Sequence, residues 1–265
     1  MICDYHLHTK MSYDSNADID CVINTAINKG MKYMAVTDHH DFDLDNRVFE
    51  QNPEVYYDTM AAFREKYKSK ITISIGIELG IEACHHIRLA EFMKRRPFDF
   101  VIGSIHGVDG LDPYYKDYWD GLSTEEGMRK YFCAILESLN VFDDFDVLGH
   151  IDYAIRYADN KEKIRYSYNT YSDILDKILK KTISMGKGIE INTAGLRKGL
   201  KDTNPSREII KKYREYGGSI ITVGSDAHTP SDIGGDFDTA RQILTDCGFT
   251  EYCVFVNRKP VFLPL

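Results

Sequence analysis

Short apolar runs alternate with longer amphipathic stretches along the whole chain. The short runs have the length and β-branched content of strands, and they lie at 2–6, 33–37, 71–78, 98–104, 147–150, 188–192 and 219–224. The longer stretches have helical periodicity, and they lie at 19–28, 55–68, 86–95, 124–139, 172–185, 205–216 and 238–247. This repeated strand–helix alternation predicts an α/β protein in which parallel strands are covered by helices, and a barrel fits it best.

Composition adds limits on the class of protein. The 265 residues show no linker and no internal repeat, which predicts a single domain over 1–265. A net charge of −8 argues against a nucleic-acid partner, although bound cations can still make a local site for a phosphate ester. No apolar run is long enough to span a membrane. Six cysteines without a CxxC pair and a polar amino-terminal segment unlike a signal peptide predict a cytoplasmic protein with reduced thiols.

Potential metal ligands follow several of the predicted strands. His6 and His8 are two residues apart on an extended segment, so their side chains point the same way, although an HxH pair also arises by chance. Glu78 follows the apolar run ITISIGI, where a buried charge needs a partner or a metal. The segment Thr37-Asp38-His39 ends another strand, with a helix cap as the alternative role.

The full set of strand ends favours one shared metal site. Six of the nine histidines stand at carboxyl ends of predicted strands, where the active site of a parallel barrel is built. The donors exceed what one tetrahedral ion needs, so we expect two or more ions with Glu78 as a bridge. Imidazole and carboxylate without thiolate suit zinc, iron or manganese. The further strand-end candidates are His106, His150, Asp226 and His228.

These motifs together resemble one known family. The ordered set His6-x-His8, Thr37-Asp38-His39, Glu78, Ser104-Ile105-His106, Gly149-His150 and Ser225-Asp226-Ala227-His228 resembles the polymerase and histidinol phosphatase (PHP) family from residue 2 to about residue 235. The resemblance implies a distorted (β/α)₇ TIM-like barrel that binds two or three divalent ions at its carboxyl-terminal face. By motif, one ion takes His6, His8, Glu78 and Asp226, a second takes Glu78, His106 and His150, and a third takes Asp14, His39 and His228. Asp14 lies in a loop-like segment, where a turn or cap is the alternative.

Within the family, several stretches look closer to the monofunctional histidinol-phosphate phosphatases than to the nuclease or polymerase-associated members. They lie at 103–110, 149–157 and 190–199. This likeness implies hydrolysis of L-histidinol phosphate, a step of histidine biosynthesis, by a hydroxide that bridges two ions, with Glu78, Asp226 and His228 as catalytic residues. Arg156 and Arg197 follow predicted strands and are expected to bind the phosphate, with surface salt bridges as the alternative.

The segment at 107–121, GVDGLDPYYKDYWDG, is too long for a simple connection and too aromatic for disorder. Asp109 and Asp112 are expected to bind the cationic end of a small phosphate monoester and the tyrosines its ring, although the segment could equally be a solvated acidic surface. His40, His85 and His86 are expected on the surface or at helix caps. Two other functions stay open at this point: a PHP phosphodiesterase or 3′–5′ exonuclease, and a non-catalytic metal-binding barrel. The sequence does not indicate an oligomeric state.

Overall fold

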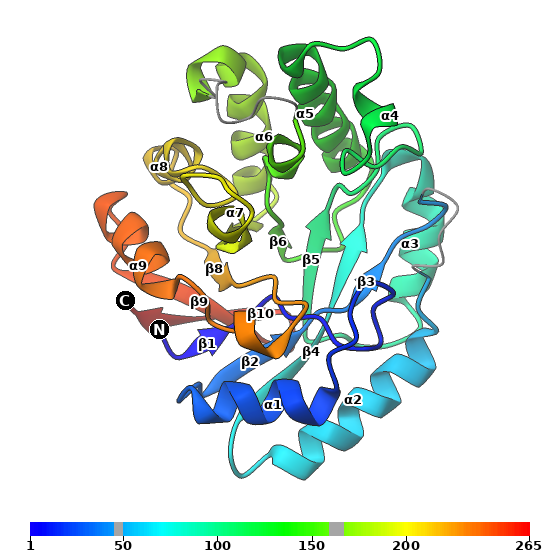
Figure 1. The fold of residues 1–265 in the computed structure, drawn as a ribbon, viewed down its shortest axis with the longest axis vertical. Coiled ribbons are helices and arrows are strands. Elements are labelled where there is room, and N and C mark those ends of the chain that lie inside the picture. The colour runs from blue at the N-terminus through cyan, green and yellow to red at the C-terminus, as the bar shows by residue number, and fades with distance from the viewer. Residues whose placement is uncertain (45–49, 159–166) are drawn as a thin grey trace.

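Parallel strands form a nearly closed barrel in the computed structural model, which describes residues 1–44, 50–158 and 167–265 (Figure 1). The strands neighbour one another in the order β1 Cys3–Asp4, β2 Tyr33–Val36, β4 Thr72–Gly80, β5 Phe100–Ser104, β6 Val147–Leu148, β7 Gly188–Asn192 and β8 Ile221–Gly224. A two-residue strand, β3 His39–His40, also pairs with β4 and sets His39 opposite Glu78. The predicted parallel α/β barrel is therefore confirmed.

Backbone hydrogen bonds join the segment that follows β1 to β8 and to the segment that follows β8, and they bring the two ends of the sheet together. The N–H of Tyr5 donates to the carbonyl of Val223 at 3.0 Å, and the N–H of Asp226 donates to the carbonyl of His6 at 2.9 Å. Further along, the N–H of His8 donates to the carbonyl of Ala227 at 3.0 Å. Closure of the barrel thus aligns the two histidines of the first segment with the segment that carries Asp226.

Helices occupy each stretch for which the sequence predicts one. They are α1 Ile19–Asn28, α2 Pro53–Tyr67, α3 His86–Met93, α5 Thr124–Val141, α6 Ser172–Ser184, α8 Arg207–Glu215 and α9 Phe237–Asp246. Local signals explain their starts: Asp18 accepts a hydrogen bond from the N–H of Asp20 at α1, and Ser123 and Glu126 form a capping box at α5. Short helices that the sequence does not predict are η1 Ala83–His85, α4 Lys116–Trp119, η2 Tyr153–Arg156, η3 Tyr168–Tyr171, α7 Ala194–Arg197 and η4 Pro230–Asp232.

The two faces of β4 show how the barrel divides core from site. Successive side chains of a strand point to opposite faces, so Ser74 and Glu78 share a face that Ile73 and Ile75 do not. The hydroxyl of Ser74 lies 3.1 Å from that of Tyr5, which follows β1, and Glu78 contacts residues that follow several other strands. The face of Ser74 and Glu78 therefore looks into the barrel, and the isoleucines belong to the hydrophobic core.

A carboxyl-terminal hairpin, β9 Glu251–Val256 and β10 Lys259–Pro264, was not predicted from the sequence. The carbonyl oxygen of Phe255 accepts hydrogen bonds from Tyr5 at 3.0 Å and from Ser74 at 2.8 Å, and its ring lies 5.0 Å from that of Phe100. These contacts lie near the amino ends of β4 and β5. The hairpin therefore covers the end of the barrel opposite Glu78.

His40 corrects one expectation from the sequence. It was expected on the surface or at a cap, yet it is 1% exposed and its ring stacks on Phe92 with centroids 3.7 Å apart. Its Nδ1 atom accepts the N–H of Gln51 at 2.9 Å, and burial lowers its pKa to about 4. His40 is thus a neutral core residue. His85 and His86 are partly exposed around the start of α3. In the described part of the chain, no helix has the length and apolarity to cross a bilayer.

Candidate metal centre and active site

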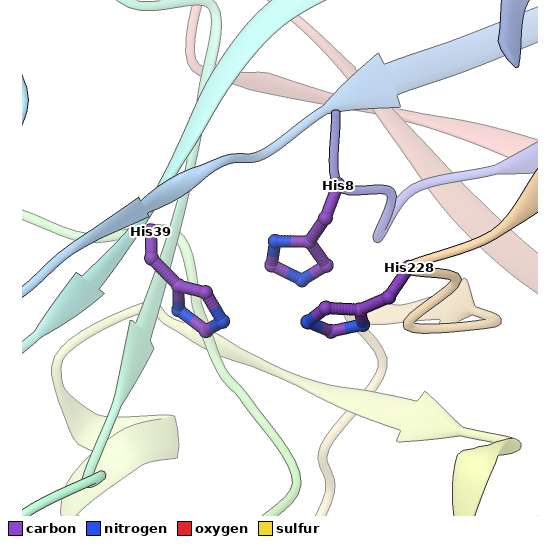
Figure 2. Close-up of side chains that lie close together, drawn as sticks. All are labelled: His8, His39 and His228. Carbon is purple, nitrogen blue, oxygen red and sulfur yellow. The ribbon is translucent and has the colours of Figure 1, made fainter. Parts of the chain in front are cut away.

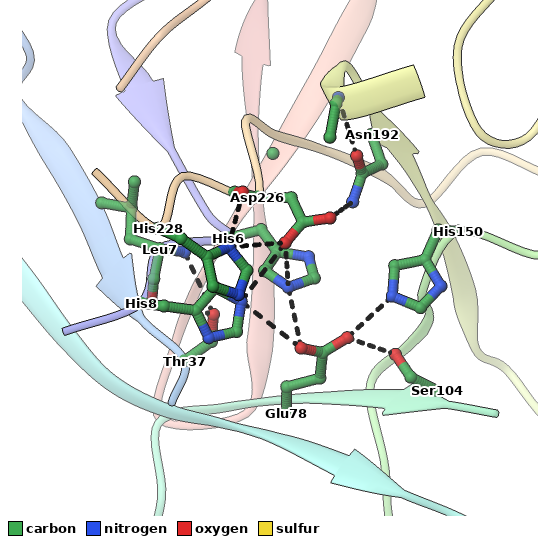
Figure 3. A network of polar contacts seen from close by, with 12 residues as sticks. His6, Leu7, His8, Thr37, Glu78, Ser104, His150, Asn192, Asp226 and His228 are labelled. Carbon is green, nitrogen blue, oxygen red and sulfur yellow. Dashed lines mark hydrogen bonds and ion pairs between the residues drawn. The ribbon is translucent and has the colours of Figure 1, made fainter. Parts of the chain in front are cut away.

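Glu78 stands at the centre of a cluster of imidazoles at the carboxyl ends of the strands (Figure 3). It is fully buried, and burial alone would raise its pKa. The surrounding histidines, when protonated, outweigh that effect and hold the pKa of Glu78 well below its usual range. The atoms around its carboxylate are Ser104 Oγ at 2.7 Å, His150 Nε2 at 2.9 Å, His6 Nε2 at 3.0 Å, His39 Nδ1 and His106 Nε2 at 3.1 Å, and His8 Nε2 at 3.5 Å.

Asp226 is the second carboxylate that faces the histidines. Its Oδ1 atom lies 3.4 Å from His8 Nε2 and 3.7 Å from His6 Nε2, while Oδ2 lies 3.1 Å from Arg156 Nη1. Burial opposes ionisation, but His6, His8 and Arg156 hold the pKa of Asp226 well below its usual range. This carboxylate therefore links the histidine cluster to a guanidinium.

His8 stays neutral among these groups. Burial, together with the positive charge that His228 and His39 can carry, lowers its pKa to about 3. The buried Nε2 atom of His8 makes no hydrogen bond to any of the described residues, although it lies between the carboxylates of Glu78 and Asp226. A neutral imidazole nitrogen that faces two carboxylates is what a divalent cation needs, so these residues fit a metal ion.

The loop residue Asp14 lies beside a group of three imidazoles, those of His8, His39 and His228. The ring of His8 lies 4.3 Å from that of His39 and 4.1 Å from that of His228 (Figure 2). The Oδ2 atom of Asp14 lies 3.0 Å from His228 Nε2 and 3.5 Å from His39 Nε2. Burial opposes protonation of His39, but the charges of Asp14 and Glu78 raise its pKa to about 9. The structure thus brings Asp14, which the sequence marks least clearly as a ligand, next to the candidate ligands His39 and His228.

Donor atoms gather in four overlapping groups, and within each group they lie within 4.8 Å of one another. Every histidine and carboxylate predicted as a ligand lies in one of these groups or, for Asp14, directly beside one. Their role as metal ligands stays a prediction. The groups are His6–Glu78–His150, His6–His8–Asp226, His8–His39–His228 and His39–Asp41–His106.

Two buried carboxylates in the site were missed in the sequence. Glu190 Oε1 lies 2.6 Å from His6 Nδ1, and Asp41 Oδ1 lies 2.8 Å from His106 Nδ1. The signal that marked Glu78 was available for Glu190, because it too is a lone acid in an apolar strand, GIEIN. Asp41 directly follows the Thr37–His40 motif, but nothing in that spacing indicates that its carboxylate reaches back to His106.

A further donor group lies outside this cluster, around η1. It comprises Glu82, Cys84 and His85. Cys84 is exposed overall. The remaining desolvation of its thiol, together with the nearby charge of Glu82, raises the pKa of that thiol. The protonated thiol is a poor metal ligand, so this group is a weaker candidate than the barrel cluster.

A cavity of about 600 Å³ opens over the histidine cluster. Arg156 and Arg197 both line it. Arg156 is 3% exposed and donates from Nε to Asn204 at 2.7 Å, while Arg197 Nη1 pairs with Asp236 at 3.2 Å. The aromatic and acidic residues on its wall include Asp112, Tyr114, Tyr115, Tyr153 and Tyr157.

The two aspartates expected to bind substrate differ in position. Asp112 lines the cavity and is 8% exposed. Asp109 is absent from the cavity lining; its side chain is 75% exposed and pairs with Lys130 at 2.9 Å. The segment at 107–121 is therefore partly cavity wall and partly solvated surface, and the structure places the carboxylate of Asp109 outside the cavity.

Comparisons with known proteins agree with this geometry. The PHP domain profile matches residues 4–194. The chain is 30% identical over 258 residues to a histidinol-phosphatase of Lactococcus lactis subsp. lactis, a match that covers 97% of this chain and 95% of the relative. It is 34% identical over 264 residues to a probable histidinol-phosphatase of Clostridium acetobutylicum, covering 99% and 96%.

A solved structure extends the likeness to three dimensions. The crystal structure of histidinol phosphate phosphatase from Lactococcus lactis, complexed with zinc, L-histidinol and phosphate, matches with a TM-score of 0.89 at 28% identity and covers 98% of both chains. The profile match spans well over half of the chain and includes β2 through β7. The chain therefore belongs to the PHP domain family.

Proposed function

We propose that this protein is a metal-dependent phosphomonoesterase that hydrolyses L-histidinol phosphate to L-histidinol and phosphate. The observation that carries the proposal is that one cavity joins three kinds of group: the histidine–carboxylate cluster, the guanidinium groups of Arg156 and Arg197, and an acidic, tyrosine-rich wall. The histidine–carboxylate cluster and the guanidinium groups suit the phosphate of such a substrate, and the acidic, tyrosine-rich wall suits its organic end. The full-length relatives named as histidinol-phosphatases support the same substrate.

Two or three divalent ions would be held by the clustered donors, with Glu78 as the bridge between two of them. Divalent cations at such a site lower the pKa of a coordinated water and neutralise charge on a phosphoryl group. Zinc, iron and manganese all accept this mixture of imidazole and carboxylate. Zinc is the first candidate, because the Lactococcus relative was crystallised with it.

The phosphoryl group is expected to contact Arg156 and Arg197. Arg156 is held in place by Asn204, by Asn192 at 3.0 Å and by Asp226. A guanidinium fixed in this way stabilises developing charge without reorganising during the reaction. Arg197 lines the same cavity through a different segment, α7, so the two cations approach the phosphate from separate elements.

The organic end of the substrate is expected to contact the wall of the cavity that includes Asp112. Its carboxylate can pair with an amine, and the tyrosine rings can pack against an imidazole or a cation. The rings of Tyr114 and Tyr157 meet at 4.9 Å in a T-shaped arrangement, so the wall continues from the 107–121 segment to the residues after η2. Holding this end would place the ester near the cluster.

The nuclease alternative is less well supported. A single-strand binding groove needs a basic track, but the chain carries a net charge of −8. Only Arg156, Arg197 and Lys198 are cationic among the described residues of the cavity wall, apart from the histidines. A small monoester matches this limited positive charge better than a polyanion. We also expect the enzyme to act in the cytoplasm, where its six free cysteines would stay reduced.

Removal and return of metal tests the proposal. Phosphate release from L-histidinol phosphate is measured before chelation, after chelation, and after addition of zinc, manganese or iron. We expect chelation to abolish the activity and at least one of these ions to restore it. An undiminished rate in protein that elemental analysis shows to be free of metal would overturn the proposal.

A further inference from the structure

We infer that Glu190 is a positioning residue that holds three candidate metal ligands, His6, His150 and Asp226, and thereby sets the affinity of the site for cations. The inference rests on the proposed metal dependence. Glu190 lies in the fully buried strand β7 and is 0% exposed. Within residues 1–44, 50–158 and 167–265, no arginine or lysine forms an ion pair with it. A buried carboxylate is costly without a partner, so its contacts explain why it is tolerated.

The direct contact fixes the orientation of His6. Its Nδ1 atom lies 2.6 Å from Glu190 Oε1, while Nε2 lies 3.0 Å from Glu78 and 3.7 Å from Asp226. A carboxylate that accepts the Nδ1 proton leaves the Nε2 lone pair directed at the other donors. Because His6 belongs to two of the four donor groups, one contact with Glu190 acts on both.

The second oxygen of Glu190 reaches the other two ligands. Oε2 accepts the backbone N–H of His150 at 3.2 Å, and the ring of that histidine lies 2.9 Å from Glu78. Oε2 also accepts the side-chain N–H of Asn192 at 3.2 Å. The amide of Asn192 in turn donates to Asp226 at 3.2 Å, a contact visible in Figure 3. One carboxylate on β7 therefore links residues that follow β1, β6 and β8.

A glycine on the neighbouring strand makes this arrangement possible. A Cβ atom at Gly224 would lie 2.3 Å from Glu190 Oε1 and 2.4 Å from the Cβ of His6. Both distances are far below van der Waals contact. Any side chain at this position would push Glu190 and His6 apart. The absence of a side chain at Gly224 of β8 thus leaves the space in which Glu190 and His6 make contact.

The test is metal affinity measured without catalysis. Wild-type protein and Glu190→Gln are dialysed against graded chelator, and the metal retained per chain is measured together with the unfolding temperature of each metal-free protein. Outer carboxylate partners of ligating histidines typically contribute 10–100-fold to metal affinity, so we expect Glu190→Gln to weaken binding by about that factor. Glu251→Gln, an exposed change on β9, should bind metal as the wild type does.

Glu190→Asp keeps the charge but shortens the side chain, and we expect a similar loss of affinity because the carboxylate no longer reaches Nδ1 of His6. If the Glu190→Gln protein does not fold, the Glu190→Asp protein tests the positioning role in its place. Wild-type affinity in either folded variant would overturn the positioning role, even if its unfolding temperature changed. Wild-type protein that binds no divalent cation would overturn both this inference and the proposed metal dependence.

Discussion

Arg156 and Asp226 form an ion pair in which Nη1 lies 3.1 Å from Oδ2 of the carboxylate. The other oxygen of Asp226 faces His8 and His6. A single carboxylate, whose side chain is only 9% exposed, therefore connects the candidate metal donors to a cation on the cavity wall. A phosphoryl group at this junction would lie between the guanidinium of Arg156 and a cation held by the candidate metal donors. Positive charge on both sides would stabilise the negative charge of the phosphoryl oxygens, which phosphoryl transfer requires.

Arg197→Ala tests the phosphate contact without disturbing a candidate metal ligand. Loss of a charge-assisted contact used in the transition state should lower kcat/KM. The fall should correspond to a loss of about 2–4 kcal/mol of transition-state stabilisation, with metal content unchanged. Arg156→Ala should have a similar effect. Arg241→Ala, an exposed change on α9, should leave kcat/KM intact. Full kcat/KM in both cavity variants would place the phosphate clamp elsewhere.

Glu78→Gln tests the centre of the cluster. The amide keeps the shape of the side chain but removes the charge that five histidines surround. We expect a lower metal content and a fall in kcat of at least about 100-fold, with the circular dichroism spectrum preserved. The matched change Glu137→Gln, on an exposed part of α5, should have no effect. Normal metal content and rate in Glu78→Gln would rule out the bridging role.

The adjacent residues His39 and His40 should respond in opposite ways. His39 lies 3.1 Å from Glu78, so His39→Ala should lower metal content. His40 stacks on Phe92 in the core, so His40→Ala should cost about 2 kcal/mol of folding stability and lower Tm by roughly 4–8 °C, while the metal content of the folded protein is kept. Elemental analysis and thermal unfolding measure the two effects. Loss of metal from His40→Ala would contradict its assignment to the core.

The sequence predicted the barrel and most of the histidine cluster because these depend on local patterns. Strand and helix periodicity is visible in a single stretch of chain, and parallel strands necessarily bring their carboxyl ends together. His6, Glu78 and His150 could therefore be grouped from the order of residues alone, although 72 residues separate each of the two histidines from Glu78. The family resemblance then added Asp14, which has no strand-end position of its own.

The missed features depend on contacts between distant segments. The side chain of Asp41 reaches His106, and whether it does so depends on the path of the chain after β3. Asp109 and Asp112 are three positions apart in one loop, yet only the fold decides which of them lines the cavity. The hairpin β9–β10 was missed for a different reason, because the prediction followed the strand–helix alternation and ended with the last helix.

Asp112→Asn tests recognition of the cationic end of the substrate, and Asp109→Asn is its matched control in the same loop. Removing the buried charge should lower kcat/KM for L-histidinol phosphate by about 10–100-fold, while an aryl phosphate without an amine should lose much less. Asp109→Asn should change neither rate, because its carboxylate pairs with Lys130 outside the cavity. Equal losses on both substrates would make Asp112 a structural residue of the loop.

The substrate preference of the metal-loaded wild-type protein bears most closely on the proposed function. Phosphate release from L-histidinol phosphate is compared, at equal concentrations, with phosphate release from an aryl phosphate monoester and with cleavage of an aryl phosphodiester and a dinucleotide. We expect the highest kcat/KM for L-histidinol phosphate, a lower value for the aryl monoester, and little or no cleavage of either diester. A preference for the dinucleotide, or failure to release phosphate from L-histidinol phosphate, would contradict the proposed function.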